Sequence, residues 1–191
     1  MLSNLWKRVA FMIASFLGVG YIPFASGTFG SVAAFLLIVP AVHYYGITGL
    51  LVVIVGTFVL GVLSTKKVLQ YTKHDPSFIV IDEVCGQAIA CLPFAFVRVD
   101  NFFIVYLWAF LLFRLFDITK PLFIGWVDRR MTNALGVMLD DVLAGVCAAI
   151  VFVLLAVTLI FWGMAGNSIP FFILVLLFLV WGIFRICWKL V

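Results

Sequence analysis

Two pairs of adjacent carboxylates are the residues of this sequence with the clearest chemistry. Asp82 and Glu83 stand directly before one apolar block, and Asp140 and Asp141 stand directly before another. A single acid at a helix start would cap free N–H groups and suit the helix dipole. Two acids at each start, with no adjacent cation, favour oxygen ligands for a hard cation such as Mg²⁺. For either pair alone, capping and metal ligation both remain open.

A basic and acidic series lies between the two pairs. Arg114, Asp117 and Lys120 are three residues apart, so they share one face of a helix that Pro121 is expected to end. One interpretation is an ion-pair ladder whose cations extend toward lipid headgroups. The other assigns Arg114 and Lys120 to a phosphate group, with Asp117 orienting them or contributing to the metal site.

Three further positions carry weaker signals. His74, beside Asp75, is either a general acid or base or an ordinary loop histidine. Thr28 belongs to a glycine-containing segment, Ser26–Ser31, that opens an apolar block. Free N–H groups there would hold an anion, although a plain turn with a Ser or Thr cap is the simpler expectation. A nucleotide P-loop is excluded because no Gly-Lys-Ser/Thr follows.

The composition determines what must surround these groups. Of 191 residues, 66% are hydrophobic and only 10% are charged, against about 25% in a soluble domain. The mean hydropathy is +1.31, so lipid must be the solvent for most of the surface. The net charge of +4 comes from scattered cations rather than a basic stripe, and we expect no nucleic-acid partner. The four cysteines form no zinc-binding cluster.

Seven apolar blocks are expected to form helices, because they lack the alternation of barrel strands. They are Val9–Phe24, Ser31–Val42, Ile47–Ser64, Val84–Val97, Phe102–Phe116, Val142–Met164 and Ile169–Ile186. We predict an all-α polytopic membrane bundle of about six membrane helices in three hairpins. The hairpins are Ser31–Ser64, Val84–Phe116 and Val142–Ile186, with outer turns at His43–Gly46, Arg98–Asn101 and Gly166–Ser168. Val9–Phe24 remains as an interfacial or re-entrant helix.

Positive charges give the expected orientation. Clusters of Lys and Arg should lie on the cytoplasmic side, which places seven of the eight acids there and only Asp100 on the outer side. Acids at a membrane surface invite a functional explanation because they are costly near lipid. We expect residues 1–191 to form one membrane-embedded domain, and no clear cleavage site marks its first apolar run as a signal peptide.

The polar motifs resemble those of the bacterial phosphatidylglycerophosphatase A family, in order and at similar spacings from about Gly18 to Gly145. The matching motifs are Pro23…Ser26-Gly-Thr-Phe-Gly-Ser31, His74-Asp75…Asp82-Glu83, Phe113-Arg114…Asp117…Lys120-Pro121…Asp128-Arg129 and Gly136-Val-Met-Leu-Asp140-Asp141…Ala144-Gly145. Phe123 and Pro76 depart from the family pattern in ways that affect loop shape. The last apolar block extends beyond some members.

The resemblance implies a multi-pass inner-membrane lipid phosphatase with its active site facing the cytoplasm. Its phospholipid substrate would be phosphatidylglycerophosphate, converted with Mg²⁺ to phosphatidylglycerol, within phospholipid biosynthesis. The hypothesis assigns the metal to Asp82, Glu83, Asp140 and Asp141. It assigns the phosphate to Thr28, Arg114, Lys120 and Arg129, and proton transfer to His74, Asp75 or Asp117.

Two other classes remain as alternatives. Another membrane lipid phosphatase or a lipid phosphotransferase would use similar metal chemistry, but the sequence lacks the Asp-Gly…Ala-Arg pattern of alcohol phosphatidyltransferases. A cation transporter would carry its carboxylates near the middle of spans, whereas here they border the predicted loops.

Overall fold

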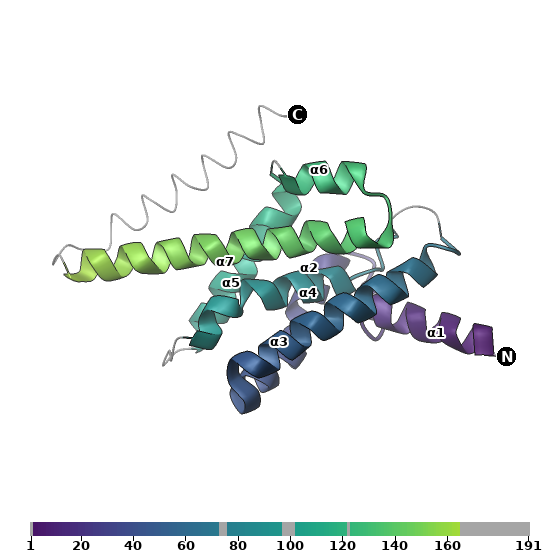
Figure 1. Cartoon of the computed structure of the whole chain (residues 1–191), viewed down its shortest axis with the longest axis horizontal. Coiled ribbons are helices and arrows are strands. Elements are labelled where there is room, and N and C mark those ends of the chain that lie inside the picture. The colour runs from purple at the N-terminus through teal and green to yellow at the C-terminus, as the bar shows by residue number, and fades with distance from the viewer. Residues whose placement is uncertain (1, 73–75, 97–101, 122, 165–191) are drawn as a thin grey trace.

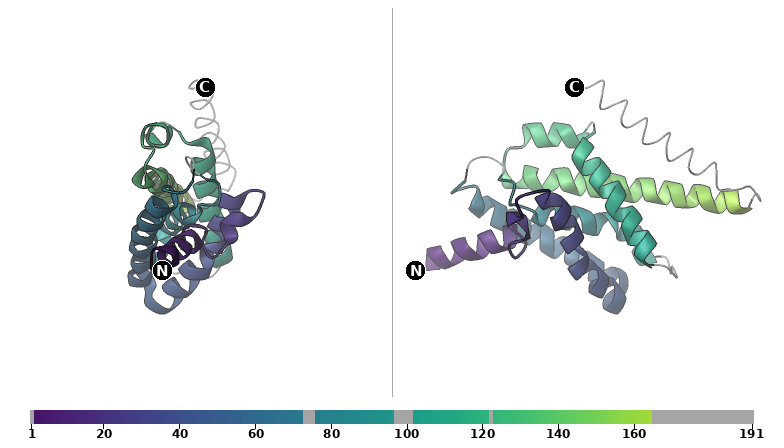
Figure 2. Two further views of the ribbon diagram at one scale, coloured as in Figure 1. Left: turned by 90° about the vertical axis from the view of Figure 1, so that its right-hand side faces the viewer. Right: turned by 180° about the vertical axis from the view of Figure 1, so that it is seen from behind.

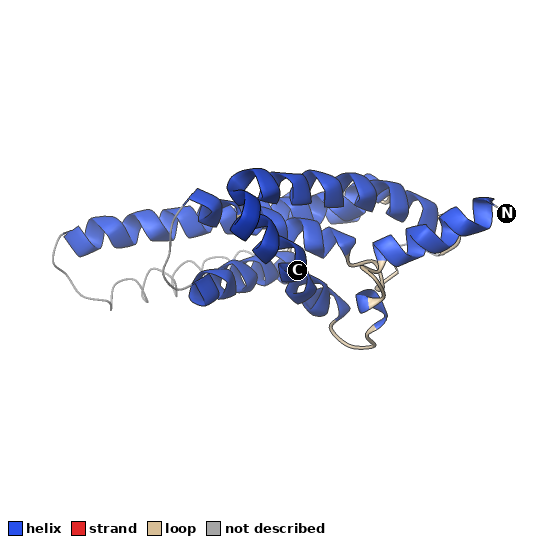
Figure 3. Ribbon diagram, turned by 90° about the horizontal axis from the view of Figure 1, so that it is seen from below, coloured by secondary structure: helices blue, strands red, loops and turns tan. Residues whose placement is uncertain are grey.

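The computed structural model describes residues 2–72, 76–96, 102–121 and 123–164, and these residues form helices and connecting loops without any strand (Figures 1 and 3). The α-helices are α1 (Leu2–Ala14), α2 (Ser26–Ala33), α3 (Phe35–Val68), α4 (Ile81–Ala90), α5 (Phe102–Thr119), α6 (Phe123–Arg130) and α7 (Ala134–Met164). Two 3₁₀ turns are η1 (Val19–Tyr21) and η2 (Leu92–Phe96). The expected all-α class is therefore confirmed for the described residues.

Helix α4 lies at the centre of the fold. It packs against α2, α3, α5 and α7, and every residue from Val84 to Ala90 is buried. At about 1.5 Å per residue, its 10 residues extend only about 15 Å, half of the ~30 Å hydrocarbon layer. Of the block Val84–Val97, expected to be one arm of a hairpin, the described residues form most of α4, Cys91 and η2. Burial in protein and exposure to lipid select the same apolar side chains, so the sequence does not separate these two environments, and the hairpin itself stays a prediction.

Two segments are long and apolar enough to cross a membrane, judged by length and composition over the described residues. They are Ser26–Val68, which comprises α2 and α3, and Ala134–Thr158 within α7. The larger arrangement of six membrane helices in three hairpins stays a prediction. The turns expected at Arg98–Asn101 and Gly166–Ser168 and the block Ile169–Ile186 lie outside the described residues.

Helix α3 changes direction at Gly46 (Figure 2), where the sequence predicts an outer turn. Gly46 has φ 58° and ψ −138°, a combination that L side chains rarely adopt. The two arms of α3 also approach closely beyond the bend, since a Cβ on Gly49 would overlap the carbonyl oxygen of Ala41. The expected turn is therefore present, although it forms as a sharp break within a nearly continuous helix.

Helix α1 lies at the opposite end of the molecule from the far end of α7 (Figure 1). It overlaps the predicted helix Val9–Phe24 only over residues 9–14, because the chain turns after Ala14 and forms η1. Its inner face buries Ala10 and Ala14 completely, and α1 packs against α3. Its outer face exposes Leu5, Trp6 and Met12. The carbonyl oxygen of Ala14 accepts a 2.9 Å hydrogen bond from the N–H of Val80, which ties α1 to the loop before α4.

Helix α7 starts earlier than the sequence indicated. Asn133 caps it, because its Oδ1 accepts a 2.9 Å hydrogen bond from the N–H of Gly136. Asp140 and Asp141 therefore lie about two turns inside the helix. The expectation that this pair stands at a helix start is wrong, and with it the capping interpretation of the pair.

Glycines let α4 and α7 approach closely enough for their acids to meet. A Cβ on Gly145 of α7 would overlap the carbonyl oxygen of Gly86 of α4. A Cβ on Gly86 would in turn lie 2.5 Å from the carbonyl oxygen of Asp141. Small residues at such a crossing are typical of close helix packing in membrane proteins. This contact positions the acids of both helices.

Candidate active site

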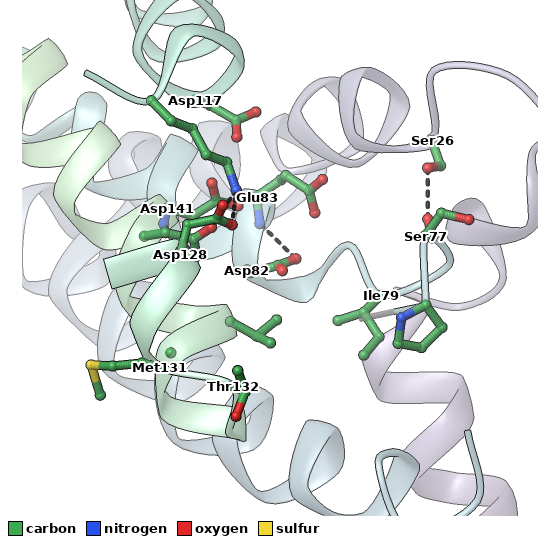
Figure 4. Close-up of a pocket in the computed structure, with 15 residues that line it drawn as sticks. Ser26, Ser77, Ile79, Asp82, Glu83, Asp117, Asp128, Met131, Thr132 and Asp141 are labelled. Atoms are coloured by element: carbon green, nitrogen blue, oxygen red, sulfur yellow. Dashed lines mark hydrogen bonds and ion pairs between the residues drawn. The ribbon is translucent and has the colours of Figure 1, made fainter. Parts of the chain in front are cut away.

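The acids gather around one cavity of about 220 Å³, bordered by the starts of α2 and α4, the end of α5, α6 and the first turns of α7 (Figure 4). Of the eight acids in the sequence, Asp75 and Asp100 lie outside the described residues. The six that the structure describes all line this cavity: Asp82, Glu83, Asp117, Asp128, Asp140 and Asp141. Lys120 contributes a cation to the same wall.

Three of these carboxylates form a tight cluster. One oxygen from each of Asp82, Glu83 and Asp141 lies within 4.8 Å of the other two. The first two acids come from the first turn of α4 and the third from α7, so the close crossing of these helices assembles the cluster. Asp82 Oδ1 also accepts a 3.0 Å hydrogen bond from the N–H of Glu83, which fixes its orientation.

The described protein atoms leave part of the hydrogen-bonding capacity of this cluster unfilled. Glu83 Oε2 is buried and has no hydrogen-bond partner among the described residues. Burial raises the pKa of Glu83 to about 8, and the charges of Asp141 and Asp117 act in the same direction. Burial, followed by the charge of Glu83, raises the pKa of Asp82 well above its usual value. Buried carboxylates with an unfilled acceptor fit a divalent cation with oxygen ligands.

Asp140 does not belong to this three-acid cluster. Its Oδ2 accepts a 2.7 Å hydrogen bond from Lys120 Nζ, which also donates to Asp128 Oδ1 at 2.5 Å. Burial would lower the pKa of Lys120, but hydrogen bonds to the two carboxylates outweigh it and raise the pKa above its usual value. The four acids that the sequence assigned to one metal site thus separate into three clustered acids and one that holds a lysine.

The predicted Arg114–Asp117–Lys120 series is only partly regular. Arg114 Nη1 and Asp117 Oδ2 form an ion pair on α5, as the spacing of three predicts. Helix α5 ends at Thr119, and Lys120 follows in a left-handed conformation with φ 39°. Lys120 therefore leaves the shared helix face and turns toward α6 and α7. Pro121 ends the helix as expected.

The start of α2 closes the opposite side of the cavity. Ser26 Oγ donates a 2.7 Å hydrogen bond to the carbonyl oxygen of Ser77, and both residues line the cavity (Figure 4). The residue before α2 is Ala25, which makes no side-chain cap, so the expected Ser or Thr cap is absent there. Ser26 instead joins α2 to the loop that leads into α4.

The other predicted site residues do not line the cavity in the described part of the chain. Thr28 is half-buried on α2, and Arg129 is exposed on α6; neither is among the residues that line the cavity. His74 and Asp75 lie outside the described residues. Arg114 is close behind the wall, with Nη1 3.5 Å from Ser31 Oγ and a buried Nε that has no partner among the described residues.

Sequence reasoning missed several residues of the cavity. Asp128 was part of a recognised motif but received no role, and its place beside Lys120 depends on the turn between α5 and α6. Ser77 and Thr132 also line the cavity, but isolated hydroxyls give no spacing signal. Ser26 belonged to the Ser26–Ser31 motif but received no role of its own. Gly27 lies directly against the cluster, because a Cβ there would overlap Glu83 Oε1 unless that carboxylate moved. The sequence shows the glycine, but it does not show that Gly27 would lie against Glu83.

The fold and the cavity define a membrane-associated helical protein whose site is built from carboxylates, a lysine and an arginine. The model of one family, phosphatidylglycerophosphatase A, matches residues 12–156, well over half of the chain. The chain belongs to the phosphatidylglycerophosphatase A family and is a phosphatase enzyme.

Named relatives agree with this membership. The phosphatidylglycerophosphatase A of Haemophilus influenzae is 36% identical over 146 residues, covering 73% of this chain and 84% of the relative. That of Escherichia coli is 30% identical over 152 residues, covering 78% and 81%. A Bacteroides thetaiotaomicron protein, 37% identical over 162 residues and covering 79% and 96%, carries the provisional name phosphatidylinositol-3-phosphatase. No solved structure matches the chain.

Proposed function

We propose that this enzyme hydrolyses the terminal phosphate monoester of phosphatidylglycerophosphate to give phosphatidylglycerol, with Mg²⁺, in phospholipid biosynthesis. The observation that carries the proposal is the buried cluster of Asp82, Glu83 and Asp141, with its unfilled Glu83 oxygen, beside a lysine in one cavity. Family membership supports the same lipid substrate. We further propose that residues 1–191 form one domain that crosses the bacterial inner membrane several times, with the cavity facing the cytoplasm.

The reaction is a transfer of the phosphoryl group to water. Water attacks phosphorus, the bond between phosphorus and the glycerol oxygen breaks, and a proton from the water passes to that oxygen. The products are inorganic phosphate and phosphatidylglycerol. Water is the co-substrate, no oxidant is needed, and the acyl chains remain in the bilayer.

The described residues divide this work between them. Asp82, Glu83 and Asp141 hold Mg²⁺, which when bound supplies Lewis acidity toward phosphate oxygens. Lys120 neutralises charge on the phosphate from the position in which Asp140 holds it. Arg114 acts from behind the wall, and its ion pair with Asp117 sets the direction of the guanidinium.

The remaining predicted roles rest on the sequence. His74, with Asp75 beside it, or Asp117 would protonate the leaving oxygen. Thr28 and Arg129 would contact the phosphate only after a change in side-chain conformation or position, since neither lines the cavity.

The test is phosphate release by the purified full chain in detergent with phosphatidylglycerophosphate, with and without Mg²⁺. Wild type should release phosphate only with Mg²⁺, and Asp82→Asn and Asp141→Asn should each lose activity by about 100-fold or more. Asp100→Asn is the matched control, because this acid is predicted for the outer side. No release by wild type would refute the phosphatase proposal, and full activity in both variants would refute the metal assignment.

A second candidate substrate comes from the relative named for phosphatidylinositol 3-phosphate. Both lipids carry a phosphate monoester on a hydroxylated headgroup, so the same carboxylate cluster would act on either. Parallel reactions with the two lipids at equal surface concentration separate them. We expect the larger kcat/KM for phosphatidylglycerophosphate, and a larger value for the inositol lipid would replace the proposed substrate.

A further inference from the structure

A second cavity, of about 570 Å³, lies against α1 and shares no lining residue with the carboxylate cavity. Its polar wall contains Asn4, Lys7 and Arg8, and its apolar wall contains Phe11, Met12 and Tyr21. Its volume falls in the range of about 300–1,000 Å³ that is usual for small-molecule sites. The proposed phosphatase reaction uses none of these residues.

The polar wall is positively charged and lacks an acidic counterpart nearby in sequence. The first acid of the chain is Asp75, so the whole segment that builds this cavity contains none. Among the described residues, the ion pairs involve Arg114 and Lys120 rather than Lys7 or Arg8. Lys7 Nζ lies 4.0 Å from the centroid of the Tyr71 ring, which holds the ammonium in place while leaving its donors available.

The apolar wall suits the membrane surface. Leu5, Trp6, Met12 and Leu17 are exposed on α1 and the turn that follows it. An amphipathic helix with cations on one face and such side chains on another lies in the headgroup region of a bilayer. There the cavity meets lipids whose phosphate is charged and whose glycerol and upper acyl carbons are apolar.

We propose that the α1 cavity binds the headgroup of an anionic phospholipid from the surrounding membrane. Lys7, Arg8 and Asn4 donate to the phosphate, and Phe11 and Tyr21 pack against the glycerol and the first acyl carbons. Charge complementarity selects this occupant, since no acid is among the described residues that line the cavity, and its two cations attract an anionic lipid more strongly than a zwitterionic one. The site is separate from the proposed hydrolysis and does not depend on it.

The bound lipid would touch residues that support the carboxylate cavity. The rings of Phe11 and Tyr21 both stack on Phe78, with centroids 5.6 Å and 5.2 Å away. The chain neighbours of Phe78, Ser77 and Ile79, line the carboxylate cavity. Lipid in the α1 cavity therefore contacts the aromatic stack behind one wall of the candidate active site.

The test uses a photoactivatable phosphatidylserine and a phosphatidylcholine analogue with identical acyl chains, added to the full chain in non-ionic detergent. Both are phosphodiesters, so a monoester phosphatase does not consume them. We expect phosphatidylserine to label residues 4–21 about ten-fold more than phosphatidylcholine does. Lys7→Gln/Arg8→Gln should reduce that labelling about ten-fold, whereas Lys7→Arg/Arg8→Lys should retain it.

The matched control is Lys66→Gln/Arg130→Gln, which removes two exposed cations that line neither cavity. It should label like wild type. The proposal is overturned if both lipids label residues 4–21 equally, or if the control double variant loses as much labelling as the first. Displacement of the lipid by millimolar inorganic phosphate would also overturn it, because the site would then bind free anions rather than a lipid. None of these outcomes alters the phosphate-release test.

Discussion

Gly27 of α2 lies directly against the carboxylate of Glu83 on α4. A Cβ at position 27 would overlap Glu83 Oε1 and lie 3.2 Å from Nη1 of Arg114. The first turn of α2 therefore covers the carboxylate cluster from one side, and a side chain at position 27 would require the Glu83 carboxylate to move.

Gly27→Ala should lower the rate of phosphate release roughly ten- to hundred-fold, because the added methyl displaces Glu83 from the cluster. The helix should persist, since alanine favours helix over glycine. The measurement is phosphate release together with thermal unfolding in detergent. Gly56→Ala is the control, because a Cβ at position 56 meets nothing within 4 Å. Equal activity in the two variants would contradict the close contact.

Lys120 should depend far more on Asp140 than on Asp128. Its ammonium donates to both, but Asp140 is buried and Asp128 is exposed. An exposed ion pair contributes about 0–1 kcal/mol, whereas removing one partner of a buried pair leaves a costly unpaired charge. Asp128→Asn should therefore change stability by less than about 1 kcal/mol, and Asp140→Asn should cost more. Denaturant unfolding of both variants and of the double variant measures the coupling.

The opposite ranking would show that Lys120 is held mainly from α6. Activity provides a second check, since Lys120→Met should also reduce phosphate release while Asp128→Asn should reduce it less. A Lys120→Arg variant keeps the charge and should recover part of the lost activity. Recovery would assign the loss to charge rather than to packing.

Glu83 should make the Mg²⁺-free protein less stable as pH rises. The pKa of Glu83 is about 8 in the folded chain, against 4.5 for the free side chain. Between these values the folded protein holds a proton that the unfolded chain has released. Stability from this group is thus present at low pH and lost as pH rises through about 8. The unfolding midpoint in chelator should fall between about pH 5.5 and 8.5.

Glu83→Gln is the matched test of that slope, because the amide keeps the shape of the side chain without its titration. The variant should show a flatter dependence of the unfolding midpoint on pH over the same interval. Added Mg²⁺ should reduce the slope in wild type, since a bound cation favours the ionised carboxylate. An identical slope in wild type and Glu83→Gln would assign the pH dependence to other groups.

The sequence predicted the main polar groups of the site, but it did not predict which acids cluster together and which acid binds Lys120. The acid pairs stood out because charge is scarce in an apolar chain, and Arg114 and Asp117 pair as their spacing of three indicated. Asp140 and Asp141 were placed at a helix start, although Asn133 begins α7 earlier. Adjacent residues on a helix point about 100° apart, so one acid meets α4 and the other meets Lys120.

The fold was harder to predict where apolar side chains face protein rather than lipid. The sequence of α4 reads as part of a membrane hairpin, but its ten residues are the centre of the described structure. Hydrophobicity alone cannot separate these two environments. The glycines at positions 86 and 145 do carry information, since they permit the close crossing of α4 and α7, but identifying that crossing requires knowing which helices are neighbours.

Phe78 offers the last test, of the connection between α1 and the carboxylate cavity. Phe78→Leu keeps an apolar side chain but removes two ring stacks, with Phe11 and with Tyr21. Aromatic pairs contribute about 0.5–1.5 kcal/mol each beyond their buried area, so the variant should lose roughly 1–3 kcal/mol of stability. Ser77 and Ile79, its neighbours, line the cavity. Their displacement should raise KM for the lipid substrate more than it lowers kcat.

Phe103→Leu is the control for Phe78→Leu, because it makes the same substitution at a side chain that is 75% exposed. It should leave both stability and KM near wild type. If Phe78→Leu instead lowers kcat at constant KM, the loop from 76 to 80 acts on the reacting groups rather than on substrate binding. If neither kcat nor KM changes, the aromatic stack anchors α1 but does not support the carboxylate cavity. A supporting stack would let the cavity wall shift once the ring contacts of Phe78 are removed.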